Sequence, residues 1–416
     1  MFDVHDRNYK TRTYLYHGKE FQFNDFTLKD PPPEVLYRMM RIPPFDFTYD
    51  GGCYPYDPAA WNVNKRFIWS CNYASAQGYG MVAENVVTNL KKLGVDVRNP
   101  GSVSGNVIGG GEFVTKEALE TVGKSCLPDC IEIQHCQPPA IRGDVVERRW
   151  SYTMFESDHT PDSWIEMLNN KVERVIVPSK WLVEAWKGQG LKIPVHVYGH
   201  GVDPEVYYYL ERPDRDTYTF VHWGELSERK GTDLVYKAFT DEFANAKDAR
   251  LILKCNKAVF FGANLGHPQI EYISATYSKK QMREMLFKAD CCVFPTRGEG
   301  FGIPPLEAMA TGLPTIVTNW SGPADFIDKD DTLYLDYKMV PANSMYMIYK
   351  DFFRPDETAG NWAEPSYEQL RYYMRWCYEH RKEAKDMGKK AAERVTREWL
   401  WSHKTAEFIS LIDSLS

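Results

Sequence analysis

Two glutamates, Glu299 and Glu307, stand on either side of a Gly-Phe-Gly turn and a pair of prolines in the segment GEGFGIPPLEAMATGLP, residues 298–314. Packing of a hydrophobic core does not require carboxylates in this arrangement. The arrangement suits a ligand that carries both phosphate and hydroxyl groups. The turn opens a predicted helix whose first amides favour an anion, and the carboxylates can accept hydrogen bonds from hydroxyl groups. A nucleotide sugar is such a ligand.

The elements around the two glutamates place them at one edge of a sheet. Residues 290–295, DCCVFP, indicate a buried strand, and residues 304–312 indicate a helix with prolines in its first turn. The loop between them, residues 296–302, then lies at the carboxyl edge of a parallel sheet, where ligands bind in doubly wound folds. Glu307 leans back toward the same point, because helical side chains tilt toward the N-terminus.

Alternating strand and helix patterns predict an α/β protein with two doubly wound domains. The chain has 416 residues, which is too long for one ordinary core. One series of patterns runs from Phe67 to about residue 203, and a second series starts again at residues 218–224, YTFVHWG. We therefore expect a first domain over residues 1–203, with residues 1–60 as an irregular, proline-rich extension, and a second domain over residues 204–395.

The composition is typical of a soluble globular enzyme. The net charge of −7 gives no general basic surface for nucleic acid, although a local basic patch is still compatible with it. The first residues are polar, and no apolar run approaches the length of a membrane span, so we expect a cytoplasmic protein. The 9 cysteines follow no regular spacing and indicate reduced thiols. A zinc site in CLPDCIEIQHC, residues 126–136, is an alternative reading of Cys126, Cys130, His135 and Cys136, but its spacing matches no standard pattern.

Several segments together resemble the retaining GT-B glycosyltransferases of family 4. The glutamate segment resembles the signature of that family, and VERVIVPSKWLVEAW with VYGHGVD resembles the end of its first domain and the crossover. WGELSERKG, residues 223–231, and NWAEPSYEQLRYYM, residues 361–374, are similar to the start and the end of its second domain. The resemblance extends over residues 66–416. It implies two Rossmann-like domains facing a central cleft, with a C-terminal helix over residues 396–416 that returns to the first domain.

The resemblance implies a donor site built from both domains. Glu299 would bind hydroxyls of the donor sugar, Glu307 would bind the ribose, and Lys230 would pair with the diphosphate. Gly78 and Gly80 would form a glycine loop that closes on the phosphates. The full donor-binding set that the resemblance implies is Gly78, Gly80, Gly224, Arg229, Lys230, Arg297, Glu299, Gly300, Phe301, Gly302 and Glu307.

One position departs from the family pattern. Glu225 stands where the family usually has arginine, and a carboxylate there would repel a diphosphate. Either Arg229 or Arg297 then supplies the missing charge, or the donor binds weakly. In YTMFESDHTPDSW, residues 152–164, Glu156 is nearest to the position of a family residue that lines the sugar pocket, and His159 is close to it. The catalytic set that we predict is Glu299, Lys230, Glu156 and His159.

These observations predict an enzyme that transfers a sugar from a nucleoside-diphosphate sugar, UDP- or GDP-linked, to an acceptor hydroxyl with retention of configuration. The resemblance implies no metal, no cofactor and no strong general base. The acceptor stays open between a glycan, a small molecule and a hydroxymethylated DNA base of the kind that some viruses modify. An alternative of another class is a nucleotide-sugar-binding protein without activity, which the departure at Glu225 would explain.

Overall fold

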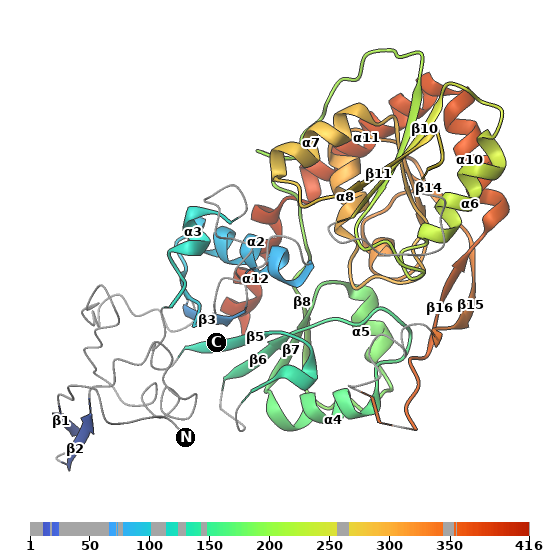
Figure 1. The fold of residues 1–416 in the computed structure, drawn as a ribbon. Coiled ribbons are helices and arrows are strands. Elements are labelled where there is room, and N and C mark those ends of the chain that lie inside the picture. Colours follow the sequence, from blue (N-terminus) through green and yellow to red (C-terminus); the bar gives the residue numbers. More distant parts are fainter. Residues whose placement is uncertain are drawn as a thin grey trace.

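The computed structural model describes residues 11–16, 19–24, 66–71, 73, 78–100, 114–123, 130–142, 148–255, 266–343, 353–354 and 356–415. Most of these residues form two α/β domains, with the second domain at the top of Figure 1 and the first domain below it. Each domain is built around a six-stranded sheet. The predicted pair of doubly wound domains is therefore confirmed.

The sheet of the first domain is parallel throughout. Its strands follow the order β4-β3-β5-β6-β7-β8. The core of the domain is buried between this sheet and its helices, as expected for parallel strands covered on both faces. The strands are β3 (Arg66–Ser70), β4 (Asp96–Arg98), β5 (Ile131–His135), β6 (Arg149–Tyr152), β7 (Arg174–Val177) and β8 (Val195–Val197).

Helix α2 (Gly78–Lys92) shows how the sequence pattern produces the first domain. Val82, Val86, Val87 and Leu90 recur at helical spacing and are all buried, as the pattern predicts. The helix starts at Gly78, earlier than expected, so the two glycines predicted to form a loop lie in its first turn instead. The other helices of the domain are α3 (Lys116–Leu119), η4 (Pro138–Ala140), α4 (Asp162–Lys171) and α5 (Lys180–Trp186).

The sheet of the second domain is also parallel and has its first strand near the middle. The order is β11-β10-β9-β12-β13-β14. The chain builds outward from β9 on one side and then returns to start the other side with β12, so the topological switch point lies between these two strands. The strands are β9 (Tyr218–Trp223), β10 (Ala249–Cys255), β11 (Ile270–Ser274), β12 (Cys291–Phe294), β13 (Thr315–Thr318) and β14 (Leu333–Leu335).

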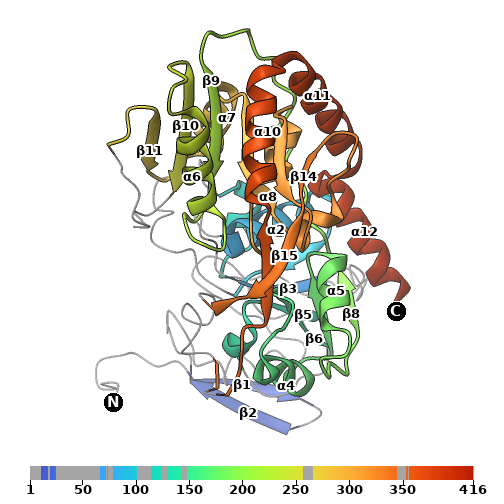
Figure 2. The ribbon, with the colours of Figure 1, turned by 90° about the vertical axis from the view of Figure 1, so that its right-hand side faces the viewer.

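Helices cover both faces of the second sheet (Figure 2). They are α6 (Thr232–Phe243), α7 (Lys279–Lys288), α8 (Ile303–Ala310), η5 (Gly322–Asp325), α10 (Tyr367–Glu379) and α11 (Arg381–Glu398). Helix α11 packs so closely behind α8 that a Cβ at Gly388 would overlap the backbone of Gly312. Within the described part of the chain, no helix is both long and apolar enough to cross a membrane.

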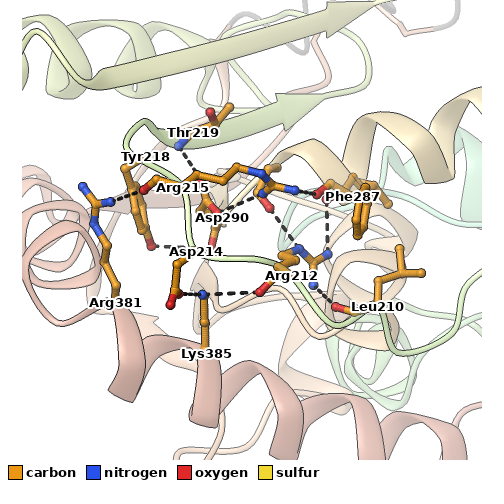
Figure 3. A network of polar contacts seen from close by, with 12 residues as sticks. Leu210, Arg212, Asp214, Arg215, Tyr218, Thr219, Phe287, Asp290, Arg381 and Lys385 are labelled. Atoms are coloured by element: carbon orange, nitrogen blue, oxygen red, sulfur yellow. Dashed lines mark hydrogen bonds and ion pairs between the residues drawn. The ribbon is translucent and has the colours of Figure 1, made fainter.

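The connector between the domains is fixed to the second domain by Arg212 (Figure 3). Its buried guanidinium donates hydrogen bonds to the carbonyls of Leu210, Leu286, Ala289 and Thr311 and to the Thr311 hydroxyl. This set uses the donor fork of arginine, which satisfies several backbone oxygens at once. The start of the second domain is therefore held against the start of β12 and the C-terminal end of α8, at the edge of the sheet opposite the predicted donor loop.

The last helix, α12 (Trp401–Ser414), returns to the first domain and lies beside α2 (Figures 1 and 2). The ring of Phe408 stacks on Tyr198 at a centroid distance of 4.4 Å, and the Tyr198 hydroxyl lies 2.7 Å from the Thr405 hydroxyl. The predicted return of the C-terminal helix is therefore confirmed.

Two antiparallel ribbons were not expected from the sequence. Strands β1 (Thr11–Tyr16) and β2 (Lys19–Asn24) pair within the extension that was predicted to be irregular, so this part has regular structure. Strands β15 (Tyr337–Pro341) and β16 (Asn361–Pro365) pair after β14 and run from the second domain toward α4 (Figure 1). The chain between β14 and α10 is therefore more than a loop.

Candidate active site

The loop after β12 carries Glu299 at the switch point of the second sheet. Its conformation depends on glycine, because Gly302 adopts φ 98° at the start of α8 and a Cβ there would crowd Pro323. Ile303, Pro304 and Pro305 then form the first turn of the helix, where prolines are tolerated since no amide donor is needed. The loop after β9, residues 224–231, lies on the other side of the same switch point.

The two loops pack directly against each other. Gly231 adopts φ 71° before α6, and a Cβ there would overlap the carbonyl of Pro295. The Arg297 amide also donates to the Arg229 carbonyl at 2.7 Å. Residues 229–231 are thereby held beside the glutamate loop.

Glu299 is the centre of a buried ionic cluster. Its Oε1 lies 2.6 Å from Lys230 Nζ, 3.4 Å from Arg229 Nη1 and 3.1 Å from Thr296 Oγ1. Burial raises the pKa of Glu299, but the two cations outweigh that effect and hold it below its ordinary value. Burial lowers the pKa of Lys230, and the contact with Glu299 opposes that change. The result is a charged cluster in which two cations stand next to one carboxylate.

Arg229 is oriented by several acceptors. Its Nη1 donates to the Gly298 carbonyl at 2.7 Å, and its Nη2 lies 3.8 Å from the Glu225 carboxylate. The Glu225 side chain is 55% exposed, so it points out of the cluster toward solvent rather than into it. Glu225, the residue that departs from the resembled pattern, thus lies beside the cluster. The nearby Arg229 offsets part of its negative charge.

Arg297 does not take part in this cluster. All five of its donors are used: Asp233 accepts two at 2.8 and 2.9 Å, Glu364 accepts two at 2.5 and 3.0 Å, and the Glu228 carbonyl accepts the fifth. The side chain therefore braces the loop from behind, and the expectation that it supplies charge to a diphosphate loses its basis. Arg229 is the arginine that lies at the cluster.

Glu307 forms a second centre on α8. It is 7% exposed, and burial raises its pKa to about 8. The hydroxyl of Tyr207, from the connector, hydrogen-bonds to it, and the charges of Lys279 and Lys254 also act on it. Tyr207, Lys254 and Lys279 were not predicted, because they lie on the connector, on β10 and at the start of α7, and they share no sequence motif.

The remaining donor residues frame the site. At Gly224, which has φ 128°, and at Gly78, no described atom lies within 4 Å of where a Cβ would stand, so both positions face open space. A Cβ at Gly300 would overlap Met154 of the first domain. Phe301 is buried, with its ring 4.6 Å from that of His200.

Glu156 of the first domain reaches the cluster. A Cβ at Gly298 would overlap the Glu156 carbonyl oxygen, so the two loops touch. Burial raises the pKa of Glu156, Arg229 opposes that change, and Glu299 adds to it. These influences place the carboxylate of Glu156 within electrostatic reach of Glu299.

His159 lies outside this group. Its Nε2 is 3.6 Å from Asp162 at the start of α4, and its side chain is 39% exposed. The structure therefore brings together Glu299, Lys230 and Glu156 of the predicted catalytic set and leaves His159 on the first domain. His159 was predicted only because it is close to Glu156 in the sequence. In the structure its side chain instead faces Asp162, at the start of α4.

Two histidines are buried in the first domain: His135, which was considered above only as a zinc ligand, and His200, which was not predicted. His135, at the end of β5, accepts from Trp69 Nε1 at 3.2 Å, and burial lowers its pKa to about 3. His200 Nε2 lies 2.7 Å from the Tyr152 hydroxyl. His135 Nε2 and His200 Nδ1 have no hydrogen-bond partner among the described residues. Cys126 of the alternative zinc reading lies outside the described residues, and no described group of three His, Cys, Asp or Glu residues could hold a metal.

Comparisons with known proteins bear on the fold and on the second domain. Residues 217–344 match the family described as Glycosyl transferases group 1. Over 202 residues the chain is 23% identical to "Putative glycosyltransferase 45" of Sulfolobus islandicus filamentous virus, covering 47% of this chain and 53% of that protein. The chain spans about half the length of the curated relatives that it matches.

Solved structures share the arrangement of both domains. The sucrose-phosphate synthase of Thermosynechococcus elongatus superposes with a TM-score of 0.59 at 14% identity, covering 84% of this chain and 99% of that chain. HepE of Anabaena, solved in complex with UDP-glucose, gives 0.59 at 10% identity, with 84% and 99% covered. The chain therefore has the GT-B fold, and its residues 217–344 are similar to the glycosyl transferases group 1.

Proposed function

We propose that this protein is a glycosyltransferase that moves a sugar from a nucleoside-diphosphate sugar to an acceptor hydroxyl with retention of configuration. The observation that carries the proposal is the buried cluster of Glu299, Lys230 and Arg229 at the switch point. Burying charged side chains costs free energy because they lose their hydration, so a buried charged cluster indicates a functional role. A site that binds a diphosphate and sugar hydroxyls together requires both signs of charge at this position.

The residues of the cluster have separate roles in this proposal. Lys230 and Arg229 stabilise the charge that develops on the leaving diphosphate, together with the first amides of α8. Glu299 accepts hydrogen bonds from hydroxyls of the donor sugar, and Glu307 accepts them from the ribose. Glu156 lies on the acceptor side of the reacting sugar. The family mechanism uses a phosphate oxygen of the donor to help deprotonate the acceptor, so no strong general base and no metal is required.

The second-domain match supports a nucleotide-sugar donor, and HepE of Anabaena binds UDP-glucose with the same fold. The experiment is a thermal-shift screen of UDP-, GDP-, ADP- and dTDP-sugars, followed by hydrolysis of each donor that stabilises the protein. Slow release of free sugar that initially has the same anomeric configuration as the donor supports a retaining transferase. Binding without any turnover, with or without an acceptor, would instead favour a nucleotide-sugar-binding protein.

The acceptor is identified in a second step. Incubation of the radiolabelled donor with a glycan library, with small alcohols and with DNA containing 5-hydroxymethylcytosine separates the three acceptor classes. A protein with a net charge of −7 has no general long-range attraction to DNA, which is also negatively charged. We therefore expect transfer to the glycan or to the small molecule.

A further inference from the structure

The ribbon of β15 and β16, residues 337–365, forms an arm that reaches from the second domain to the first. Figure 1 shows it extending from the lower end of α10 down to the level of α5, in the direction of α4. Of this arm the structure describes residues 337–343, 353–354 and 356–365. Within β16, the side chain of Trp362 is only 2% exposed, so this strand is covered by other parts of the molecule.

A hydrophobic cluster joins the arm to the first domain. Trp362, Ala363 and Phe353 of the arm are buried in one cluster with Phe155 and Trp164 of the first domain. The ring centroid of Phe353 lies 6.4 Å from those of Phe155 and Trp164. Phe155 immediately precedes Glu156, so the arm packs against the base of the loop that carries this carboxylate.

Asn361, at the start of β16, holds the same loop by polar contacts. Its amide donates to Asp158 Oδ1 at 2.6 Å, and its side-chain nitrogen donates to Asp158 Oδ2 at 3.1 Å. The Asp158 amide donates in turn to the Asn361 carbonyl at 2.9 Å. Asp158 is thus bound through both its backbone and its carboxylate, close to Glu156.

The other end of β16 holds the Glu299 loop. The Ala363 amide donates to the Arg297 carbonyl at 2.9 Å, and Glu364 accepts two hydrogen bonds from the Arg297 guanidinium. One short strand therefore binds two loops that belong to different domains. Between those loops, Gly298 rests on the Glu156 carbonyl with no room for a Cβ.

We propose that β16 sets the position of Glu156 relative to Glu299 and that Asn361 is a positioning residue for the transfer step. The inference rests on the proposed function, since it assumes that sugar transfer takes place at a site bordered by Glu156 and Glu299. Removing the Asn361 side chain loosens the Glu156 loop while Lys230, Glu299 and Glu307 keep their places in the second domain. Turnover then falls, whereas nucleotide affinity does not.

The experiment compares Asn361→Ala, Asp158→Ala and the double variant with Arg354→Ala in the full chain. Arg354 pairs with Glu166 and is a matched control, because it joins the arm to the first domain without touching either loop. The first measurement is hydrogen exchange of residues 153–160, which needs no donor. We expect at least tenfold faster exchange in Asn361→Ala and an unchanged rate in Arg354→Ala.

The second measurement uses UDP-glucose hydrolysis and calorimetry with UDP. We expect Asn361→Ala to lower kcat at least tenfold with the Kd for UDP within twofold of the wild type. The double variant should be no slower than the slower single variant, because both side chains act through one contact. Arg354→Ala should be within twofold of the wild type in both measurements.

Exchange that is equal in Asn361→Ala and Arg354→Ala would overturn the positioning role, whatever the donor. A loss of UDP affinity as large as the loss of kcat would also overturn it, since the effect would then be general. If Asp158→Ala does not fold, as judged by circular dichroism, Glu364→Gln replaces it and should act on residues 296–302. A wild-type chain that neither binds nor hydrolyses any nucleotide sugar would contradict the proposed function instead, independently of the exchange result.

Discussion

The ammonium of Lys230 lies 2.6 Å from the carboxylate of Glu299, although the two residues are 69 positions apart in the chain. The contact forms because β9 and β12 are neighbours at the switch point and release their loops at the same edge. Arg229 shares the same carboxylate oxygen at 3.4 Å. The pair is thus part of a preorganised charged cluster, and its removal gives the most direct test of the proposed chemistry.

Lys230→Ala should lower kcat for donor hydrolysis by about 10²–10³, because the leaving diphosphate loses a charged partner in a buried site. Steady-state kinetics with the donor found in the screen would measure this. Lys237→Ala is the matched control, since Lys237 pairs with Asp241 on the exposed face of α6. Equal kinetics of the two variants would remove Lys230 from the reaction.

Glu307→Ala should weaken binding of the bare nucleoside diphosphate, because the ribose hydroxyls lose a buried acceptor. The free protein holds this carboxyl protonated near pH 7, and a hydrogen bond between neutral groups contributes about 0.5–1.5 kcal/mol, which corresponds to a loss of roughly two- to tenfold in affinity. Calorimetry with UDP measures the change, and the exposed Glu284 on α7 provides the control Glu284→Ala. An unchanged Kd would show that the ribose binds elsewhere.

The raised pKa of Glu307 predicts a pH dependence of stability. The folded protein keeps a proton on this carboxyl up to about pH 8, whereas an unfolded glutamate releases it near 4.5. The folded state therefore binds more protons in this window, and the free energy of unfolding falls as the pH rises through it. Glu307→Gln should remove this contribution. Urea unfolding at pH 5 and pH 8 should show the variant gaining stability relative to the wild type at the higher pH.

The control for this comparison is Glu271→Gln, at an exposed position of β11. Its free energy of unfolding should follow that of the wild type at both values of pH. A Glu307→Gln variant that behaves in the same way would mean that Glu307 is ionised in the folded protein.

Arg297→Ala should act on stability rather than on donor affinity. The change leaves the carboxylates of Asp233 and Glu364 without their shared partner. Because these side chains are 43% and 26% exposed, water screens them and the expected loss is about 1–2 kcal/mol. Chemical denaturation measures this loss, and the conservative Arg297→Lys should recover only part of it because lysine lacks the donor fork. A variant of normal stability with weakened UDP binding would return Arg297 to the donor site.

Glu225→Arg should tighten UDP binding several-fold at low salt and less at high salt. The exposed carboxylate lies 3.8 Å from Arg229, so replacing it with a cation adds positive potential beside the diphosphate position. Glu228→Arg is the matched control, because Glu228 is an exposed neighbour in the same loop. If both variants change the affinity equally, the effect is one of net charge and Glu225 has no special place.

Much of the fold could be predicted from the sequence because its signals are local. The run DCCVFP predicts β12 since a strand buried on both faces is apolar throughout, and the valines of α2 predict its buried face by their spacing. The glycines and prolines around Glu299 likewise predict a tight turn into α8, because few other residues adopt that backbone.

The tertiary structure decided what the individual charges do. Arg229 and Arg297 both stand near the predicted site in the sequence, but only folding brings Asp233 and Glu364 to Arg297 and leaves Arg229 beside Glu299. In the same way, Glu307 meets Tyr207 and Glu156 meets Gly298 through contacts between distant segments. Local periodicity fixes which elements form, whereas the partner of a side chain depends on which elements the completed fold places together.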